Sequence, residues 1–207
     1  MSDRGPRLCA LFDEIASRVG TASLRTIGFT GAVLDEGAST LALGTALSLA
    51  ALEESPVLLV DANWPRPSLT ADAGATARPG LSDALRGVVQ LDRAVLPTGR
   101  RGLAFLPAGS SAGSRPSLDD LGGFLDAALG RYRTVVVDLP PALAEESVVL
   151  AWAASLQQLF VVVRNGVTPL ALVRRAIDEV ALEQPQVVLN RTNATAIPAA
   201  PQRAAVI

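Results

Sequence analysis

The sequence predicts an α/β fold with a mostly parallel central sheet flanked by helices. Short apolar runs alternate with helical patterns along the chain, as they do when helices connect the strands of a parallel sheet. A glycine-containing loop, residues 31–37, follows the first apolar run and precedes a strong helical stretch. Two later apolar runs end at Asp61 and Asp138. We therefore expect a site where the carboxyl ends of these strands meet.

The expected elements form one domain over residues 1–190. Residues 63–80 are rich in Pro, Ala, Gly and Thr and are expected to be an irregular surface stretch, while residues 191–207 are expected to be a flexible tail. Strands are expected at 26–30, 57–60, 103–106, 134–137, 159–163 and 187–189. Helices are expected at 8–19, 39–52, 81–86, 118–129, 145–155 and 168–182.

The composition excludes several classes of function. The formal net charge of −2 argues against a general nucleic-acid binder. There is no histidine, so histidine-based catalysis and histidine-ligated zinc are excluded. Cys9 is the only cysteine and is expected to be a small core residue that forms no internal disulfide. No apolar run reaches the roughly 18 residues that span a bilayer, so we expect a soluble, cytoplasmic protein.

Lysine is absent from the chain. All 18 basic residues are arginine, which a GC-rich genome would favour. The chemical consequence is that no lysine of this chain can contact a phosphate group.

The loop after the first strand has the layout of a phosphate-binding loop. Residues 31–40 read GAVLDEGAST. In a working loop of this kind, backbone N–H groups and the helix N-terminus bind phosphates, a lysine follows the second glycine, and the next Ser or Thr binds Mg²⁺. Gly37 and Ser39 are in place, but Ala38 occupies the lysine position.

Several segments together resemble a known family. Residues 27–40, 58–69 (LLVDANWPRPSL) and 133–141 (RTVVVDLPP) are similar to the first strand with its Walker A loop, the second Walker motif and the Walker B strand of ParA/MinD-type P-loop ATPases. Within that group the chain most resembles the cytoplasmic domain of bacterial tyrosine kinases of exopolysaccharide and capsule synthesis. Residues 79–87, 102–109, 161–166 and 187–190 resemble further segments of these kinases.

The resemblance implies roles for individual residues. If a nucleotide binds, it would contact Gly31, Gly37, Ala38, Ser39, Thr40 and Asn190, the last at a position where relatives often contact adenine. If Mg²⁺ binds, Ser39 and Asp138 would hold it. Asp61 and Asp138 stand at the catalytic positions and are expected to be vestigial.

The loop departs from the family's Pro-Gly-Glu-Gly-Lys-Ser pattern at two positions, and each difference changes the charge of the loop. Ala38 removes a cation that faces the phosphates, and Asp35 adds a carboxylate where the family has glycine. One such charge pair at ~4 Å contributes about 1 kcal/mol in water and about 4 kcal/mol at an effective dielectric of 20. Catalysis is therefore expected to be lost, with no cofactor bound or with ATP or ADP and Mg²⁺ bound weakly.

Three hypotheses follow for the function. The first is an inactive, kinase-like regulator or scaffold of exopolysaccharide biosynthesis or export. It would bind a membrane polysaccharide co-polymerase or an active paralogue, which could recruit it to the inner face of the membrane. The second is a slow ATPase in which an arginine, such as Arg66, Arg164 or one from a dimer mate, replaces the lysine. The third is a ParA/MinD-like positioning factor unrelated to polysaccharides. A homodimer is compatible with each, and no nucleic-acid partner is expected.

Overall fold

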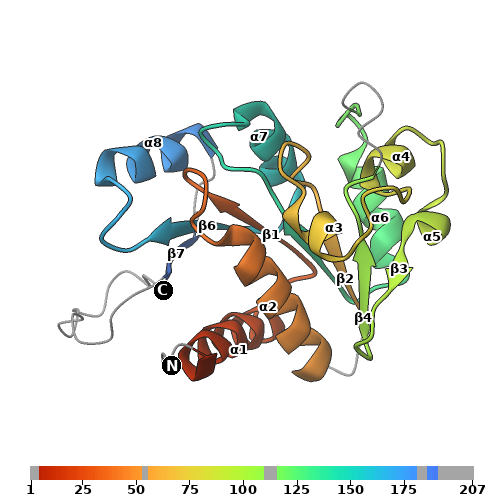
Figure 1. The fold of residues 1–207 in the computed structure, drawn as a ribbon, viewed down its shortest axis with the longest axis horizontal. Helices are drawn as coiled ribbons and strands as arrows, with labels where there is room; N and C mark the ends of the chain where they lie inside the picture. Colours follow the sequence, from red (N-terminus) through yellow and green to blue (C-terminus); the bar gives the residue numbers. More distant parts are fainter. Residues whose placement is uncertain (1–4, 53–55, 110–115, 181–185, 191–207) are drawn as a thin grey trace.

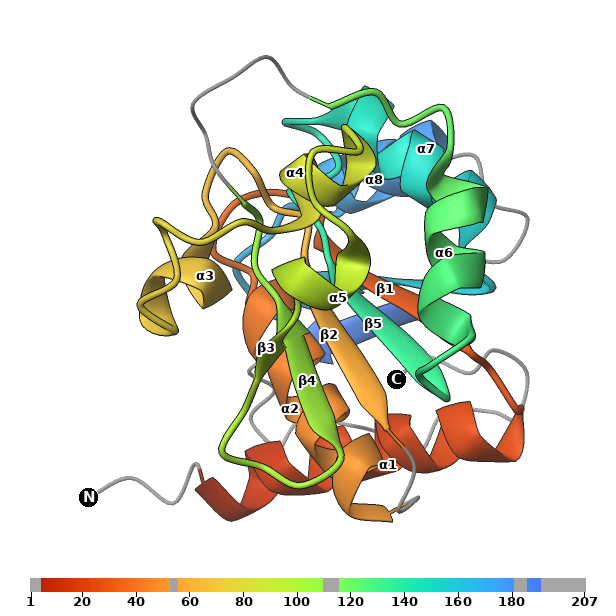
Figure 2. The same ribbon diagram turned by 90° about the vertical axis from the view of Figure 1, so that its right-hand side faces the viewer.

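One sheet organises the described part of the chain. The computed structural model describes residues 5–52, 56–109, 116–180 and 186–190. Seven strands form the sheet in the order β3-β4-β2-β5-β1-β6-β7, with helices on both faces (Figures 1 and 2). Every neighbouring pair is parallel except β3–β4, which is antiparallel. The predicted fold class is confirmed.

The central strands are buried on both faces, which explains their continuous apolar sequences. All residues of β1, β2 and β5 are buried. The strands are β1 (Thr26–Gly31), β2 (Val57–Asp61), β3 (Leu96–Pro97), β4 (Leu103–Leu106), β5 (Thr134–Asp138), β6 (Gln158–Arg164) and β7 (Gln186–Asn190).

Two hydrophobic clusters lie on opposite faces of the sheet. One cluster joins α1, α2 and α3 to the sheet, and the other joins α4, α6, α7 and α8 to it. Figure 2 shows α6 and α7 on one side of the sheet and α2 on the other. The helices are α1 (Gly5–Thr21), α2 (Ala38–Leu52), α3 (Ser68–Asp72), α4 (Leu81–Leu85), α5 (Leu91–Ala94), α6 (Leu121–Leu129), α7 (Glu146–Ser155) and α8 (Leu170–Val180).

The structure corrects some sequence predictions. The stretch expected to be irregular contains α3, because the Asp61 carboxylate accepts the Thr70 N–H (2.9 Å) in the first turn of that helix. The short α5 and the two-residue β3 had no recognisable pattern. The helix expected from residue 118 begins at Leu121 because Asp120 caps it by accepting the Gly123 N–H (3.1 Å). Cys9 is exposed, so its prediction as a core residue was wrong.

Two further expectations concern the ends and the membrane. The expected tail, residues 191–207, lies outside the described residues. Across the part of the chain that the structure describes, no helix combines the length and apolar character needed to cross a bilayer.

Candidate functional site

The sheet brings the predicted site residues together at one edge. In the register of β2 and β5, Asp61 lies directly beside Asp138, and Phe29 of β1 lies on the other side of Asp138. The phosphate-loop segment starts at the end of β1 and leads into the N-terminus of α2. The meeting of strand ends that the sequence predicts is therefore confirmed.

A buried glutamate holds the loop in shape. Glu36 is only 2% exposed, and its Oε2 accepts hydrogen bonds from the backbone N–H groups of Ala32 (2.5 Å) and Val33 (3.2 Å). Its Oε1 accepts a hydrogen bond from the Thr168 hydroxyl, which comes from the segment between β6 and α8. The loop held in this way leads into the N-terminus of α2, where the first backbone N–H groups of a helix can bind an anion.

Asn190 lies against this loop at the end of β7. Its Nδ2 donates to the Glu36 carbonyl oxygen (2.7 Å), and the side chain is 7% exposed. Gly37 has φ of 96°, and a Cβ there would lie 2.3 Å from the same Nδ2. Glycine is therefore required at position 37 by both the backbone and the packing. In this geometry Asn190 supports the loop, while its contact with adenine stays a prediction.

A pocket of about 470 Å³ opens in front of the loop. It contains the expected nucleotide-binding positions Gly31, Gly37, Ala38, Ser39 and Thr40. Residues from three other segments complete it: Asn63, Arg66, Ser68, Leu139, Pro141 and Arg164. The alanine side chain presents no donor or charge to this space, so at position 38 only the backbone N–H is left to contribute to anion binding.

Two arginines line the pocket, and they differ in their partners. Arg66 Nη1 lies 2.9 Å from Asp35 Oδ1, with the two side chains 60% and 68% exposed. Such an exposed pair contributes about 0–1 kcal/mol, but it offsets the negative charge that Asp35 adds to the loop. Asp35 adopts φ of 63°, a conformation that the family's glycine would take more readily.

Arg164, at the end of β6, has no ion-pair partner in the described chain. Its Nε is buried without a hydrogen-bond acceptor. Both arginines are candidates to replace the missing lysine. Arg66 is already paired with Asp35, whereas Arg164 has no ion-pair partner in the described chain.

Asp61 is integrated into the fold. Its Oδ2 accepts the N–H (2.9 Å) and the hydroxyl (2.7 Å) of Thr70, and its Oδ1 accepts the Asn63 N–H (3.1 Å). Burial raises the pKa of the carboxyl group, and the hydrogen bonds from Thr70 and Asn63 oppose this rise. These contacts give Asp61 a structural role at the start of α3.

Asp138 is fully buried, yet neither of its carboxylate oxygens accepts a hydrogen bond of normal geometry from the described residues. Burial raises its pKa well above the ordinary value, the nearby Ser39 hydroxyl lowers it, and the Asp61 charge raises it further. The effect of Ser39 reflects proximity rather than a well-formed hydrogen bond. A buried carboxylate without hydrogen-bond donors is costly to keep ionised, which is why burial favours the protonated form of Asp138.

The oxygen donors around Asp138 fit Mg²⁺ or a metal-bound water. Ser39 supplies a hydroxyl and Asp138 a carboxylate, which are the ligand types that Mg²⁺ takes while it keeps several waters. A triphosphate fits the same pocket less well, because Ala38 lacks the charge that would face its terminal phosphates. When bound, Mg²⁺ would neutralise charge on a phosphate ligand.

Sequence reasoning missed two side chains that shape the site. Thr168 contacts Glu36 across 132 residues of sequence, and no local pattern marks it. Thr70 connects Asp61 to the end of β4 because its hydroxyl oxygen accepts the Ala108 N–H (2.9 Å). Glu36 aligns with the glutamate of the Pro-Gly-Glu-Gly-Lys-Ser pattern, so the sequence does mark this position as part of the loop.

Comparisons with solved structures show which known fold this geometry has. No model of a known protein family matches the sequence, and no curated protein matches it. Solved structures do match. The kinase domain of VpsO is 24% identical, with a TM-score of 0.81 over 92% of this chain and 97% of that one. The chain has the fold of bacterial tyrosine kinase domains and ParA/MinD ATPases.

Two further structures show the breadth of this similarity. The BceF tyrosine kinase domain is 28% identical, with a TM-score of 0.67 over 84% of this chain and 70% of that one. A chain of the MinC:MinD cell division complex of Aquifex aeolicus is 22% identical, with a TM-score of 0.64 over 83% and 70% of the two chains. The resemblance inferred from the sequence motifs is thus confirmed at the level of fold.

Proposed function

We propose that this chain is a kinase-like P-loop protein that has lost phosphoryl transfer and acts as a regulatory or scaffolding component of exopolysaccharide biosynthesis or export. The observation that carries this proposal is that alanine occupies position 38, where the family's pattern has lysine, in the lining of the phosphate-loop pocket. The loop keeps its shape through Glu36 and Asn190, so the fold has been retained while the cation for phosphate has been lost.

The loss affects catalysis more than binding. Charge builds up on the transferred phosphoryl group in the transition state, and a fixed cation stabilises it most there. No lysine elsewhere in the chain can replace the missing one. A protein with this pocket is therefore suited to presenting a surface to a partner rather than to turning over ATP.

The proposal is tested by titrating the chain with ATP and Mg²⁺ in a calorimeter and by measuring phosphate release. We expect no hydrolysis above a buffer control and binding too weak to saturate in the micromolar range. The gain-of-function variant Ala38→Lys should bind ATP about tenfold more tightly or better. Micromolar binding together with Mg²⁺-dependent hydrolysis by the unmodified chain would overturn the proposal.

The partner follows from the same proposal. We expect a protein of the polysaccharide export machinery, such as a membrane co-polymerase, or an active paralogue of this chain. Co-purification of the tagged chain from its own cells, followed by reconstitution with the purified partner, tests this. Recovery of chromosome or division proteins instead would favour the positioning-factor hypothesis.

A slow ATPase is the second candidate, and the uncommitted Arg164 favours it. This guanidinium lines the pocket and has no ion-pair partner in the described chain. If it replaces the lysine, Arg164→Ala and Asp138→Ala should each abolish a measurable rate. The exposed Arg78→Ala is the matched control and should leave that rate unchanged. Equal rates in all variants would remove this candidate.

A further inference from the structure

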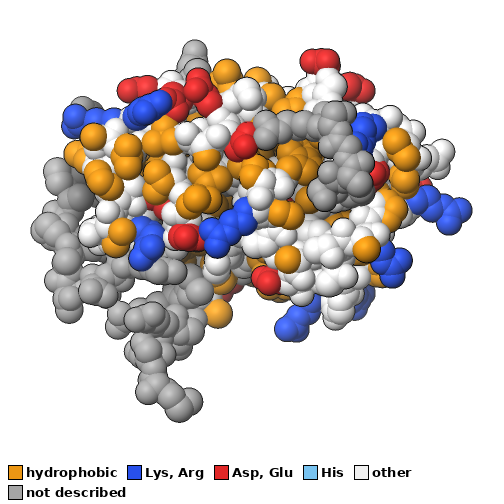
Figure 3. Space-filling view, turned by 45° about the horizontal axis from the view of Figure 1, so that its top comes forward, with side chains coloured by type: hydrophobic (Ala, Val, Ile, Leu, Met, Phe, Trp, Pro, Cys, Tyr) orange, Lys and Arg blue, Asp and Glu red, His pale blue; other side chains and the backbone are white. Residues whose placement is uncertain are grey.

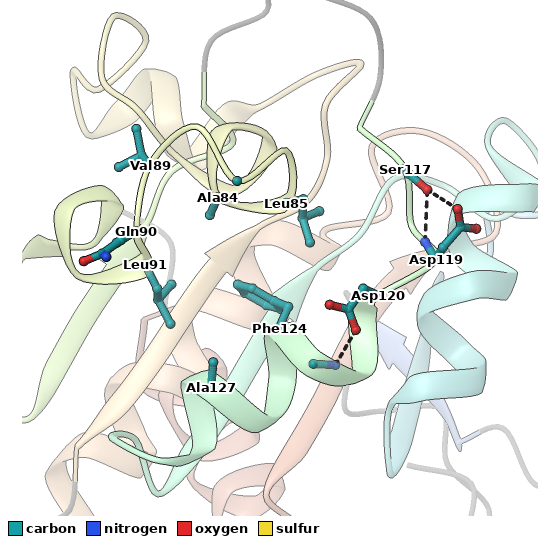
Figure 4. Close-up of a pocket in the computed structure, with 12 residues that line it drawn as sticks. Ala84, Leu85, Val89, Gln90, Leu91, Ser117, Asp119, Asp120, Phe124 and Ala127 are labelled. Carbon is teal, nitrogen blue, oxygen red and sulfur yellow. Dashed lines mark hydrogen bonds between the residues drawn. The ribbon is translucent and has the colours of Figure 1, made fainter.

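A second cleft lies away from the phosphate-loop pocket, between α4, α5 and α6. It has a volume of about 490 Å³. Figure 4 shows Leu85 from α4, Leu91 from α5, and Phe124 and Ala127 from α6 around this space. These side chains give the cleft an apolar floor. Apolar clefts of this size on a protein surface commonly receive a side chain or helix of a partner.

One end of the cleft is acidic. Asp119 and Asp120 lie there, beside Ser117 (Figure 4). Asp119 accepts a hydrogen bond from the Ser117 hydroxyl, and Asp120 caps α6. Neither carboxylate has an ion-pair partner in the described chain. An occupant of the cleft should therefore combine an apolar anchor with a basic group.

The exposed face of α8 has that combination. Leu170 is 64% exposed, and Val167 just before the helix is 60% exposed. Arg174 is exposed and has no ion-pair partner in the described residues, whereas its neighbour Arg175 pairs with Glu179 (2.7 Å). Leu170 and Arg174 are four residues apart, so they lie on the same side of the helix about 6 Å from each other. Figure 3 shows hydrophobic, arginine and acidic side chains side by side on the molecular face that includes α8.

The spacing of the two surfaces matches. Asp120, the residue that caps α6, and Phe124, a largely buried side chain at the floor of the cleft, are also four residues apart. The carboxylate and the apolar contact of the cleft are therefore spaced like Arg174 and Leu170 on α8. If α8 lies antiparallel to α6, Leu170 reaches Phe124 while Arg174 reaches Asp119 and Asp120. The antiparallel arrangement also opposes the two helix dipoles.

We propose that the cleft between α4, α5 and α6 binds the exposed face of α8 of a second copy of this chain. Within one molecule, α7 lies between α6 and α8, and the two surfaces are at opposite ends of the sheet (Figure 1). A copy therefore cannot fill its own cleft. The contact is head-to-tail and generates a ring or an open chain, not a symmetric pair.

The association is weak because the contact is small. A single short helix in a cleft falls at the low end of interface sizes, so we expect a dissociation constant on the order of 10–100 µM. Clustering on a partner would raise the local concentration and favour assembly. The proposal is independent of nucleotide binding, so it stands or falls separately from the proposed function.

Sedimentation velocity of the full chain, over a concentration series reaching about 1 mM, tests the association. We expect concentration-dependent growth for the unmodified chain. Asp119→Arg, which leaves the cap residue Asp120 in place, and Leu170→Asp should each weaken association at least about tenfold. Arg175→Ala, on α8 but already paired within its helix, is the matched control and should associate normally.

Mixing the two interface variants tests whether the cleft of one copy binds α8 of another. Asp119→Arg keeps a working α8, and Leu170→Asp keeps a working cleft. At concentrations where the unmodified chain associates, each variant alone should stay largely monomeric, and an equimolar mixture should form a one-to-one dimer. Arg174→Ala serves as a second α8 variant should Leu170→Asp fail to fold by circular dichroism. An unmodified chain that stays monomeric, or a mixture that stays monomeric while the unmodified chain associates, would overturn the proposal.

Discussion

Asp61 and Asp138 end neighbouring strands in direct register, but their surroundings are opposite. Both are fully buried. Asp61 accepts three hydrogen bonds from Thr70 and Asn63, whereas Asp138 accepts none of normal geometry from the residues that the structure describes. Identical residues at equivalent strand ends can therefore have different surroundings: one carboxylate is hydrogen-bonded to the start of α3, and the other is buried without a hydrogen-bond partner among the described residues.

This difference predicts unequal effects of mutation on stability, which can be measured by chemical denaturation. The largest effect is expected for Asp61→Ala. It removes three hydrogen bonds and leaves the Thr70 and Asn63 N–H groups without acceptors, so the free energy of unfolding should fall by about 2–4 kcal/mol. Asp138→Ala is the matched control and should cost less. Equal losses at both positions would contradict the comparison.

Thr70→Val should have the next largest effect. Its hydroxyl donates to Asp61 and accepts from the Ala108 N–H, and valine keeps the shape while it loses both bonds. We expect the free energy of unfolding to fall by about 1–3 kcal/mol. Thr45→Val, which removes a buried hydroxyl without a hydrogen-bond partner, serves as the control and should be neutral or stabilising. A neutral Thr70→Val would show that Asp61 does not depend on this contact.

Asp138→Asn should stabilise the protein. The substitution keeps the shape but removes a carboxyl group that burial makes costly to ionise. At neutral pH we expect the free energy of unfolding to rise, because the uncharged amide costs less to bury than the carboxylate. Asp61→Asn should not stabilise in this way, because it weakens acceptors that are in use. A destabilised Asp138→Asn would show that the orphaned carboxylate has an unrecognised partner.

The smallest effect is expected in the pH dependence of stability. The pKa of Asp138 is raised in the folded state, mainly by burial, so the folded protein holds its proton to higher pH than the unfolded chain does. Stability should therefore decrease as pH rises from the ordinary aspartate value of 3.8 towards the raised folded pKa. Asp138→Asn should flatten this decrease, which unfolding curves at several pH values would detect. An unchanged slope would rule out the contribution of Asp138.

The sequence was informative where local chemistry decides the structure. Apolar strands that end in aspartate predicted a site where the carboxyl ends of the strands meet. The glycine and serine around Ala38 predicted the phosphate loop. It was less informative where a distant contact decides. The first turn of α3 depends on Asp61, the loop depends on Thr168, and the two-residue β3 has too few residues to show a pattern.

The sequence by itself determined the fold class, the absence of lysine from the pocket and the positions of both strand-end aspartates, because these depend on residue identity and local periodicity. Only the tertiary structure decided that Asp61 is satisfied and Asp138 is not, that Arg66 is paired and Arg164 is free of ion pairs in the described chain, and that a second cleft faces away from the loop. Hydrogen bonding and charge compensation are properties of neighbours in space, and the residues concerned are far apart in the chain.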